Sequence, residues 1–159
     1  MLGRLYEGET CSAARTLEIV GERWSLLIIR NAMFAHMTRF TDFERGLGVA
    51  PNVLAKRLGE FVEAGIFELR PGAAGGHSEY ILTDKGRDLM PIVVALTEWG
   101  DRWAAPPDGP PLSYEHEGCG GQVALKMECA RCGEEPPPAR VTVRLAGWFR
   151  EQRDRWVPA

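Results

Sequence analysis

A proline-rich stretch near residue 108 places the strongest limit on how this chain of 159 residues folds. The segment Ala104-Ala-Pro-Pro-Asp-Gly-Pro-Pro-Leu112 has four prolines within nine residues. No helix or central strand can pass through it, because proline lacks a backbone N–H group and fixes φ. The sequence therefore predicts three parts: a main domain over residues 1–104, a small module over 113–146 and a tail over 147–159.

Length, composition and charge exclude several classes of protein. Apolar residues make up 45% and charged residues 26% of the chain, as in ordinary globular proteins. The chain is too short for a barrel enzyme or a paired Rossmann fold. It has no apolar run that could span a bilayer or serve as a signal peptide, so we expect a cytoplasmic protein with no membrane partner. The net charge of −3 gives no global attraction to nucleic acid.

Apolar spacing predicts two helices at the start of the main domain. The first covers residues 11–20, with Ser12 as its N-cap and an end at Gly21. The second runs from about Arg23 to Phe34. Its residues are apolar nearly all round, which indicates a helix buried in the core.

A capping box and a proline mark the next two helices. Thr41-Asp-Phe-Glu44 places a capping side chain three residues before a glutamate. This pattern predicts a short helix that stops at Gly46 or Gly48. Pro51 suits the first position of a further helix over residues 51–64, because its fixed φ is already helical.

Two strands and a last helix complete the main domain. Residues 66–70 alternate like a strand, and 79–82 form the returning strand after a flexible turn. Thr83 caps a last helix that reaches Trp103, and Pro91 is expected to kink or split this helix. The order predicts a winged helix-turn-helix domain of the α+β, mainly α, class.

The polar face of helix 51–64 carries residue types that read base edges in a major groove. Asn52 and Lys56 point away from the apolar face, and Val53 and Arg57 flank them. Asn pairs with adenine, Lys or Arg with guanine, and Val contacts a thymine methyl group. The alternative is an amphipathic helix whose polar side chains are merely solvated. With the hairpin wing included, the candidate DNA-contacting residues are Arg39, Thr41, Pro51, Asn52, Val53, Lys56, Arg57, Arg70 and His77.

Several ordered motifs carry a resemblance to a known family. They are Cys11-Ser-Ala-Ala-Arg-Thr-Leu-Glu-Ile-Val-Gly-Glu-Arg-Trp24, Arg39-Phe-Thr-Asp-Phe43, Pro51-Asn-Val-Leu-Ala-Lys-Arg-Leu58, Glu79-Tyr-Ile-Leu-Thr-Asp-Lys-Gly86 and Leu96-Thr-Glu-Trp-Gly100. Together they resemble the HxlR family of bacterial winged-helix regulators, relatives of the MarR type, over about two-thirds of the chain. Phe43 stands where the family usually has Leu. Ala50 stands where it often has Ser, which removes an N-cap worth about 0.5–2 kcal/mol.

The resemblance implies a homodimeric, sequence-specific DNA-binding repressor or activator that dimerises through its first and last helices. Cys11 matches a position where some members carry a redox-sensing thiol. The alternative for this residue is a small side chain packed at the dimer interface. The candidate dimer-interface residues are Leu89, Val93, Leu96, Trp99 and Trp103, which could instead pack within their own domain.

Three cysteines and a histidine dominate the small module. His116-Glu-Gly-Cys119-Gly and Cys129-Ala-Arg-Cys132-Gly have the same spacing between candidate metal ligands, and each ends in glycine. Three thiolates and one imidazole would fill a tetrahedral, structural Zn²⁺ site. With a strand hairpin over 122–127 and a third strand over 141–145, this predicts a small β-rich zinc-ribbon-like module. A metal-free module with a Cys129–Cys132 disulfide remains the alternative. The candidate zinc ligands are His116, Cys119, Cys129 and Cys132.

These patterns favour a homodimeric, DNA-binding transcription regulator that responds to a redox change or a small molecule. The alternative is a winged-helix and zinc-ribbon module that binds proteins of the transcription machinery, which the acidic net charge favours. We expect no enzymatic activity, because no paired carboxylates, nucleophile triad or phosphate-binding loop is recognisable.

Overall fold

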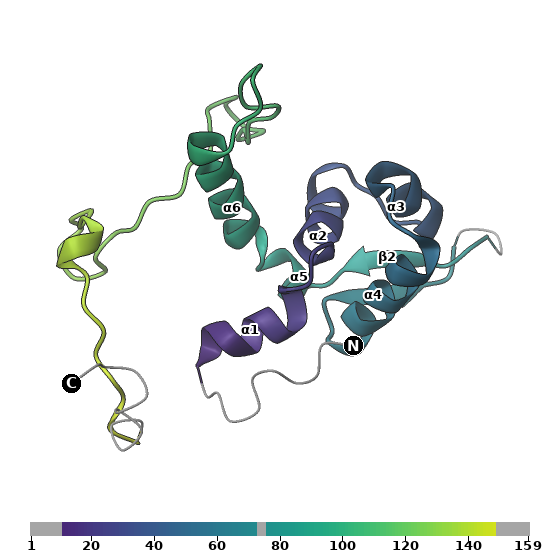
Figure 1. Ribbon diagram of the computed structural model, residues 1–159, viewed down its shortest axis with the longest axis horizontal. Coiled ribbons are helices and arrows are strands. Elements are labelled where there is room, and N and C mark those ends of the chain that lie inside the picture. The colour runs from purple at the N-terminus through teal and green to yellow at the C-terminus, as the bar shows by residue number, and fades with distance from the viewer. Residues whose placement is uncertain (1–10, 73–75, 149–159) are drawn as a thin grey trace. The chain divides into compact units, whose positions relative to one another are not determined.

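A computed structural model of the chain describes residues 11–72 and 76–148. It divides after Val123 into a first unit and a second unit, which we describe separately. The first unit contains six helices and a hairpin among its described residues. In chain order these are α1 (Ser12–Val20), α2 (Ser25–Phe34), α3 (Phe40–Leu47), α4 (Pro51–Glu63), β1 (Phe67–Arg70), β2 (Glu79–Leu82), α5 (Asp84–Arg87) and α6 (Met90–Trp103) (Figure 1).

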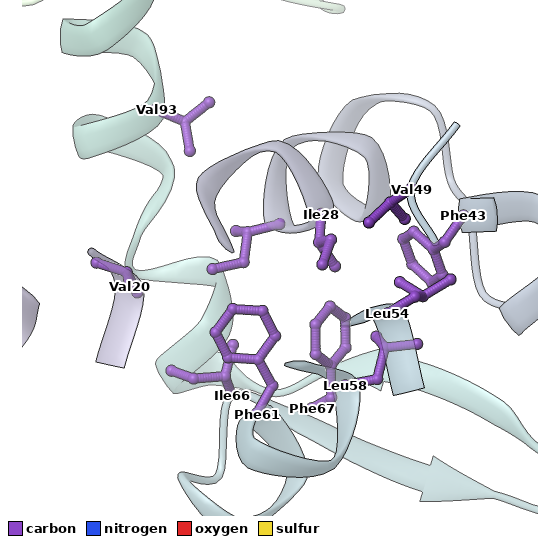
Figure 2. Close-up of a cluster of buried hydrophobic side chains, with 11 residues drawn as sticks. Val20, Ile28, Phe43, Val49, Leu54, Leu58, Phe61, Ile66, Phe67 and Val93 are labelled. Atoms are coloured by element: carbon purple, nitrogen blue, oxygen red, sulfur yellow. The ribbon is translucent and has the colours of Figure 1, made fainter. Parts of the chain in front are cut away.

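One apolar cluster holds the first unit together. Phe67 on β1 lies near its centre, with ring centroids 5.8 Å from Phe61 and 6.3 Å from Phe43. Burial of such aromatic side chains is worth about 3–5 kcal/mol each relative to alanine. Figure 2 shows the inward-pointing residues, which come from α1, α2, α3, α4, α6, β1 and the connecting loops. The cluster consists of Val20, Ile28, Ile29, Phe43, Val49, Leu54, Leu58, Phe61, Ile66, Phe67 and Val93.

The hairpin is antiparallel and is hydrogen-bonded to the loop between α2 and α3. Its register pairs Phe67 with Leu82 and Arg70 with Glu79. The backbone N–H of Tyr80 donates to the carbonyl of Thr38 at 2.7 Å, which fixes β2 beside the segment that leads into α3. The predicted pair of strands, and with it the mainly helical α+β class with a small sheet, is confirmed.

Thr83 and Pro91 divide the last helical region as predicted. The Thr83 hydroxyl accepts a hydrogen bond from the N–H of Gly86 at 3.1 Å and donates to the carbonyl of Gly65 at 2.6 Å. α5 ends at Arg87, and α6 begins at Met90 with Pro91 in its first turn. Pro91 has no N–H group to continue the helical ladder, so the helix is split there.

Two predicted helix caps are wrong. α1 begins at Ser12 itself, with Cys11 as its N-cap and no side-chain cap hydrogen bond. α3 begins at Phe40, with Arg39 as its N-cap, so Thr41 lies inside the first turn and caps nothing. The observed N-cap lies one residue before the predicted one in α1 and two residues before it in α3. Boundaries of this kind depend on tertiary packing more than on one side chain.

The first unit extends beyond the proline-rich stretch to Val123. Tyr114 packs on α2, with its ring centroid 4.6 Å from that of Phe34. Its hydroxyl also shares a 2.9 Å hydrogen bond with Thr97 on α6. The residues after the prolines therefore return to the helices, because Tyr114 finds both an apolar surface and a polar partner there.

The predicted strands over 122–127 and 141–145 are absent from the described part of the chain. In their place are an isolated bridge between Glu115 and Gln122 and a short 3-10 helix, Pro138–Arg140. Alternating apolar residues here have no apolar surface to cover, and Val143 is 81% exposed. A strand pattern without a buried face does not stabilise a sheet. The rest of the predicted tail, from residue 149, lies outside the described residues.

None of the described helices has the length and apolar character needed to cross a membrane.

Candidate nucleic-acid interface

α3 and α4 form a helix-turn-helix through a three-residue turn. Gly48 ends α3 in the left-handed region, at φ 60°, and its N–H donates to the carbonyl of Glu44 at 2.9 Å. Glycine adopts this conformation without steric cost. Val49 is buried in the core, and Pro51 then starts α4. Ala50 is the N-cap of α4 and offers no side-chain oxygen, as predicted.

α4 has one buried face and one exposed face. Leu54, Leu58 and Phe61 are fully buried against the core (Figure 2). The first two turns present the opposite face to solvent. The exposed residues of this face are Pro51, Asn52, Val53, Ala55 and Lys56. Four of the predicted DNA-contacting residues therefore share one accessible surface at the N-terminal half of this helix.

Lys56 and Arg57 are adjacent in sequence but have different surroundings. The side chain of Lys56 is 51% exposed, with its Nζ 3.7 Å from Oε1 of Glu60. The side chain of Arg57 is only 10% exposed. Its guanidinium lies 2.6 Å from Oε2 of Glu60 and 3.4 Å from Oε2 of Glu22, in the loop before α2. The structure thus assigns Arg57 to an internal ion-pair cluster, contrary to its predicted place on the DNA-reading face.

The charge of Arg57 compensates one buried carboxylate oxygen of Glu60. Oε2 of Glu60 is inaccessible to solvent and has no hydrogen bond of good geometry in the described structure. The 2.6 Å ion pair with Arg57 therefore offsets the cost of removing this oxygen from water. The pair also holds the second half of α4 to the loop that carries Glu22.

The remaining predicted contacts lie on α3 and the hairpin. Arg39, with a 61% exposed side chain, places its Nε 3.3 Å from Oε1 of Glu79 on β2. Thr41 is exposed on the first turn of α3. Arg70 is exposed at the end of β1 and forms an ion pair with Glu68. His77 is exposed before β2, and residues 73–75 at the tip of the hairpin lie outside the described residues.

The predicted dimer-interface residues divide into two groups. Val93 is 2% exposed and belongs to the core, and Leu89 is half-buried against that core. Leu96, Trp99 and Trp103 are 50%, 62% and 66% exposed along α6. α6 extends from α2 on the side away from α3 (Figure 1).

Sequence analysis did not single out two exposed apolar residues, one on α6 and one on α1. Ile92 lies one turn before Leu96 on α6, and Leu17 is half exposed on α1. Ile92 precedes Leu96 by four residues, a helical spacing that could have added Ile92 to the predicted interface from the sequence alone. Cys11, the predicted redox-sensing residue, is half-buried at the N-terminus of α1.

An open cavity of about 560 Å³ lies between α2, α6 and the segment that carries Tyr114. Its walls are mostly apolar, with the polar groups of Arg30 and Ser113 at their edges. Two nitrogens of the Arg30 guanidinium donate to Oδ1 of Asn31, at 2.9 and 3.1 Å. Nothing in the sequence indicated this cavity, because residues 105–112 read as a linker between domains.

Each of the two candidate metal-binding motifs forms a tight turn. In the first unit, Nδ1 of His116 lies 3.2 Å from Sγ of Cys119. In the second unit, backbone N–H groups of Arg131 and Cys132 point at the Cys129 sulfur, and the Cys132 thiol hydrogen-bonds it. These contacts lower the pKa of the Cys129 thiol from its ordinary value. Within either unit, the described residues hold no group of three His, Cys, Asp or Glu side chains arranged as metal ligands.

Comparison with known proteins agrees with this architecture. Residues 19–108 match the family model described as HxlR-like helix-turn-helix. An HTH-type transcriptional regulator of Mycobacterium tuberculosis, Rv3095, is 42% identical over 142 residues, which cover 89% of this chain and 88% of that protein. The similarity therefore continues beyond residue 104 into the C-terminal region.

Two solved structures are also similar. PA1607, a putative transcription factor, has a TM-score of 0.79 at 36% identity and covers 87% of this chain and 97% of its own. The reduced form of the redox regulator HypR has a TM-score of 0.53 at 29% identity. That match covers 58% of this chain and 92% of the HypR chain.

Proposed function

Because this chain belongs to the HxlR-like helix-turn-helix family of transcription regulators, we propose that it binds operator DNA sequence-specifically as a homodimer. One observation carries the proposal. The first two turns of α4 expose Asn52, Val53 and Lys56 on one face, while the opposite face anchors the helix in the core. A helix held in this way can enter a major groove without disturbing the fold.

The exposed half of α4 supplies the reading groups. Asn52 has the donor and acceptor needed to pair with N6 and N7 of adenine, and Val53 can contact a thymine methyl group. Lys56, one turn after Asn52, reaches a guanine edge or a phosphate. Pro51 and the uncapped N-terminus of α4 bring the positive end of the helix dipole toward the DNA backbone.

Ion pairs reduce the repulsion between acidic residues and phosphate. Glu60, in the last turn of α4, is neutralised by Arg57 and Lys56. Glu79 on the hairpin is neutralised by Arg39. Since Arg39 is largely exposed, its guanidinium can exchange the carboxylate for a DNA phosphate at little cost. This arrangement reconciles DNA binding with a net charge of −3.

A second copy of the chain is the proposed occupant of the exposed face of α6. Ile92, Leu96, Trp99 and Trp103 are spaced four, three and four residues apart, which places them along one side of the helix. Exposed tryptophans in such a stripe are unusual on a monomer and common at dimer interfaces. A twofold dimer would place two copies of α4 about one turn of DNA apart, roughly 34–36 Å.

We also propose that Cys11 makes the regulator responsive to oxidation. It is the N-cap residue of α1 and is half-buried there. The similarity to the redox regulator HypR supports this assignment. Oxidation at Cys11 would alter the helix that the family resemblance places at the dimer interface, and so the spacing of the two reading helices.

The test is binding of the purified full chain to duplexes selected from a random library, followed by fluorescence anisotropy across a salt series. The account predicts salt-sensitive binding to a twofold-symmetric site, with log K falling by about 0.9 for each phosphate contact per decade of salt. Asn52→Ala and Lys56→Ala should each weaken binding to the selected duplex. Arg23→Ala, which removes an exposed charge from the loop before α2, is the matched control. Equal binding to selected and scrambled duplexes would refute the proposal.

A further inference from the structure

The cavity between α2 and α6 has one wall that lies beyond the domain described by the family model. Five of its lining residues follow residue 108, where that match ends: Leu112, Ser113, Tyr114, Glu115 and Val123. The other lining residues come from α2, the residue after α2, and α6. All of them belong to the first unit, which ends at Val123. The family's shared domain therefore does not form this cavity by itself.

Hydrogen bonds hold the added wall in place. The N–H of Val123 donates to the carbonyl of Tyr114 at 2.7 Å, which closes the intervening segment into a loop. The hydroxyl of Thr97 on α6 donates to the carbonyl of Val93 at 3.0 Å, so the Tyr114 hydroxyl is the donor in its 2.9 Å bond with Thr97. The Tyr114 ring is thus fixed between α6 and Phe34 of α2. The cavity exists without a ligand, as most small-molecule sites do.

The size and lining of the cavity suit a flat apolar molecule. Its volume of about 560 Å³ lies within the range of about 300–1,000 Å³ that is usual for small-molecule sites. Phe34 and Tyr114, with ring centroids 4.6 Å apart, line it together with Met90 and Val94. Phe34 is 41% exposed. A ligand ring packed on these side chains would remove their apolar surface from water.

Arg30 gives the cavity a positive charge that no carboxylate of the described chain neutralises. Its Nε and Nη2 both donate to one neutral oxygen, Oδ1 of Asn31, and the guanidinium forms no ion pair with any described residue. These two contacts use the side edge of the half-buried guanidinium. Its end edge, formed by Nη1 and Nη2, is left for a carboxylate, which can accept two parallel hydrogen bonds from it.

The other charges near this site set the charge of the ligand. Glu115 is the second charged residue among those that line the cavity, and its exposed carboxylate accepts a 3.4 Å hydrogen bond from Ser113. A ligand with two negative groups would be repelled by it. Arg87 lines a second cavity of about 560 Å³, but its guanidinium already pairs with Asp84 at 2.6 Å. Of the two cavities, the first alone combines apolar walls with an arginine that has no carboxylate partner.

We propose that the first cavity binds an aromatic monocarboxylic acid. The ring of the ligand lies against Phe34 and Tyr114, and its carboxylate accepts hydrogen bonds from the end edge of Arg30. Such a ligand contacts both α2, which packs on α3, and α6, which carries the proposed dimer face. It would therefore act as the small-molecule effector of the regulator. That consequence rests on the proposed function, whereas binding itself is measured without DNA.

The test uses the full chain with naphthoate as the probe and the matching naphthamide as a neutral probe of the same shape. Titration calorimetry should show naphthoate binding about 10–100-fold more tightly, because hydrogen bonds to a charged group are the stronger ones. Acetate, a carboxylate without a ring, should not bind measurably. Arg30→Gln should abolish the preference for the acid. Arg87→Gln, in the second cavity, is the matched control and should keep it.

Amide NMR spectra of the same samples locate the bound probe. Naphthoate should shift the backbone amides of Ser113, Tyr114 and Val123 and leave that of Asn52 on α4 unchanged. Equal affinity for naphthoate and naphthamide in the wild-type chain would overturn the proposal, even if Arg30→Gln fails to fold. Shifts confined to the second cavity, or no binding at millimolar naphthoate, would also overturn it. None of these outcomes bears on operator binding, so the two proposals fail separately.

Discussion

Replacing Arg57 with alanine should destabilise the protein without removing a base-reading group. Lys56→Ala should weaken DNA binding and leave the stability of the protein nearly unchanged. The two residues are neighbours on α4, and their residue types alone suit DNA contact equally well. The structure separates them, because Arg57 is directed inward to Glu22 and Glu60 while Lys56 is half exposed. The pair of variants therefore distinguishes an internal ion pair from a DNA contact.

The magnitude follows from the burial of the three side chains. Removing one member of a fully buried ion pair costs about 3–5 kcal/mol, and leaving a buried acceptor unpaired costs about 1–3 kcal/mol. The side chains of Glu22 and Glu60 are 40% and 41% exposed, so water screens part of the loss. We therefore expect Arg57→Ala to lower the free energy of unfolding by about 2 kcal/mol and Tm by about 4–8 °C.

Urea denaturation and DNA anisotropy on the same samples form the assay. Arg57→Ala should shift the urea midpoint but keep DNA affinity when measured well below its Tm. Lys56→Ala should change stability by less than about 0.5 kcal/mol and weaken DNA binding by about 1–3 kcal/mol. The double variant Arg57→Ala/Glu60→Gln should recover part of the lost stability. Loss of DNA binding by Arg57→Ala with an unchanged midpoint would refute this reasoning.

Three further changes test other parts of the structure. Glu79→Gln should free Arg39 for phosphate, raising DNA affinity at low salt and steepening the salt slope by up to about 0.9; an unchanged slope would show that Arg39 does not reach the DNA. Thr83→Ala should lower the free energy of unfolding by about 1–2 kcal/mol in thermal denaturation, because it removes both the cap of α5 and the bond to Gly65. Trp99→Lys should convert a dimer to a monomer in light scattering, whereas Val143→Lys should not. A Trp99→Lys protein that stays dimeric would contradict the proposed interface.

Local signals were sufficient for the elements that position the reading helix. Pro51 and the apolar spacing after it predicted α4 to within one residue, and Pro91 predicted the split between α5 and α6. Each signal acts within one or two turns of the residue that carries it. The same is true of the two strands, which differ from the prediction by one residue at most.

Long-range contacts account for what the sequence did not show. Arg57 lies beside the polar face of α4, and no pattern within the helix indicates that Glu22 approaches it from the loop before α2. Tyr114 likewise gives no local sign that it returns to Phe34 and Thr97 across the proline-rich stretch. In both cases the burial of the side chain depends on partners that are distant in sequence. Hydrophobic periodicity does not predict such contacts, because it describes only residues within a turn or two of each other.

The central claim is that the N-terminal half of α4 reads bases, and a protein–DNA double-mutant cycle tests it most directly. Affinities would be measured for wild type and Asn52→Ala on the selected duplex and on duplexes with single symmetric base-pair changes. The account predicts that wild type loses about 1–3 kcal/mol at one A·T pair of each half-site, and that Asn52→Ala no longer distinguishes the bases there. An Asn52→Ala protein that keeps the full base preference at every position would contradict it.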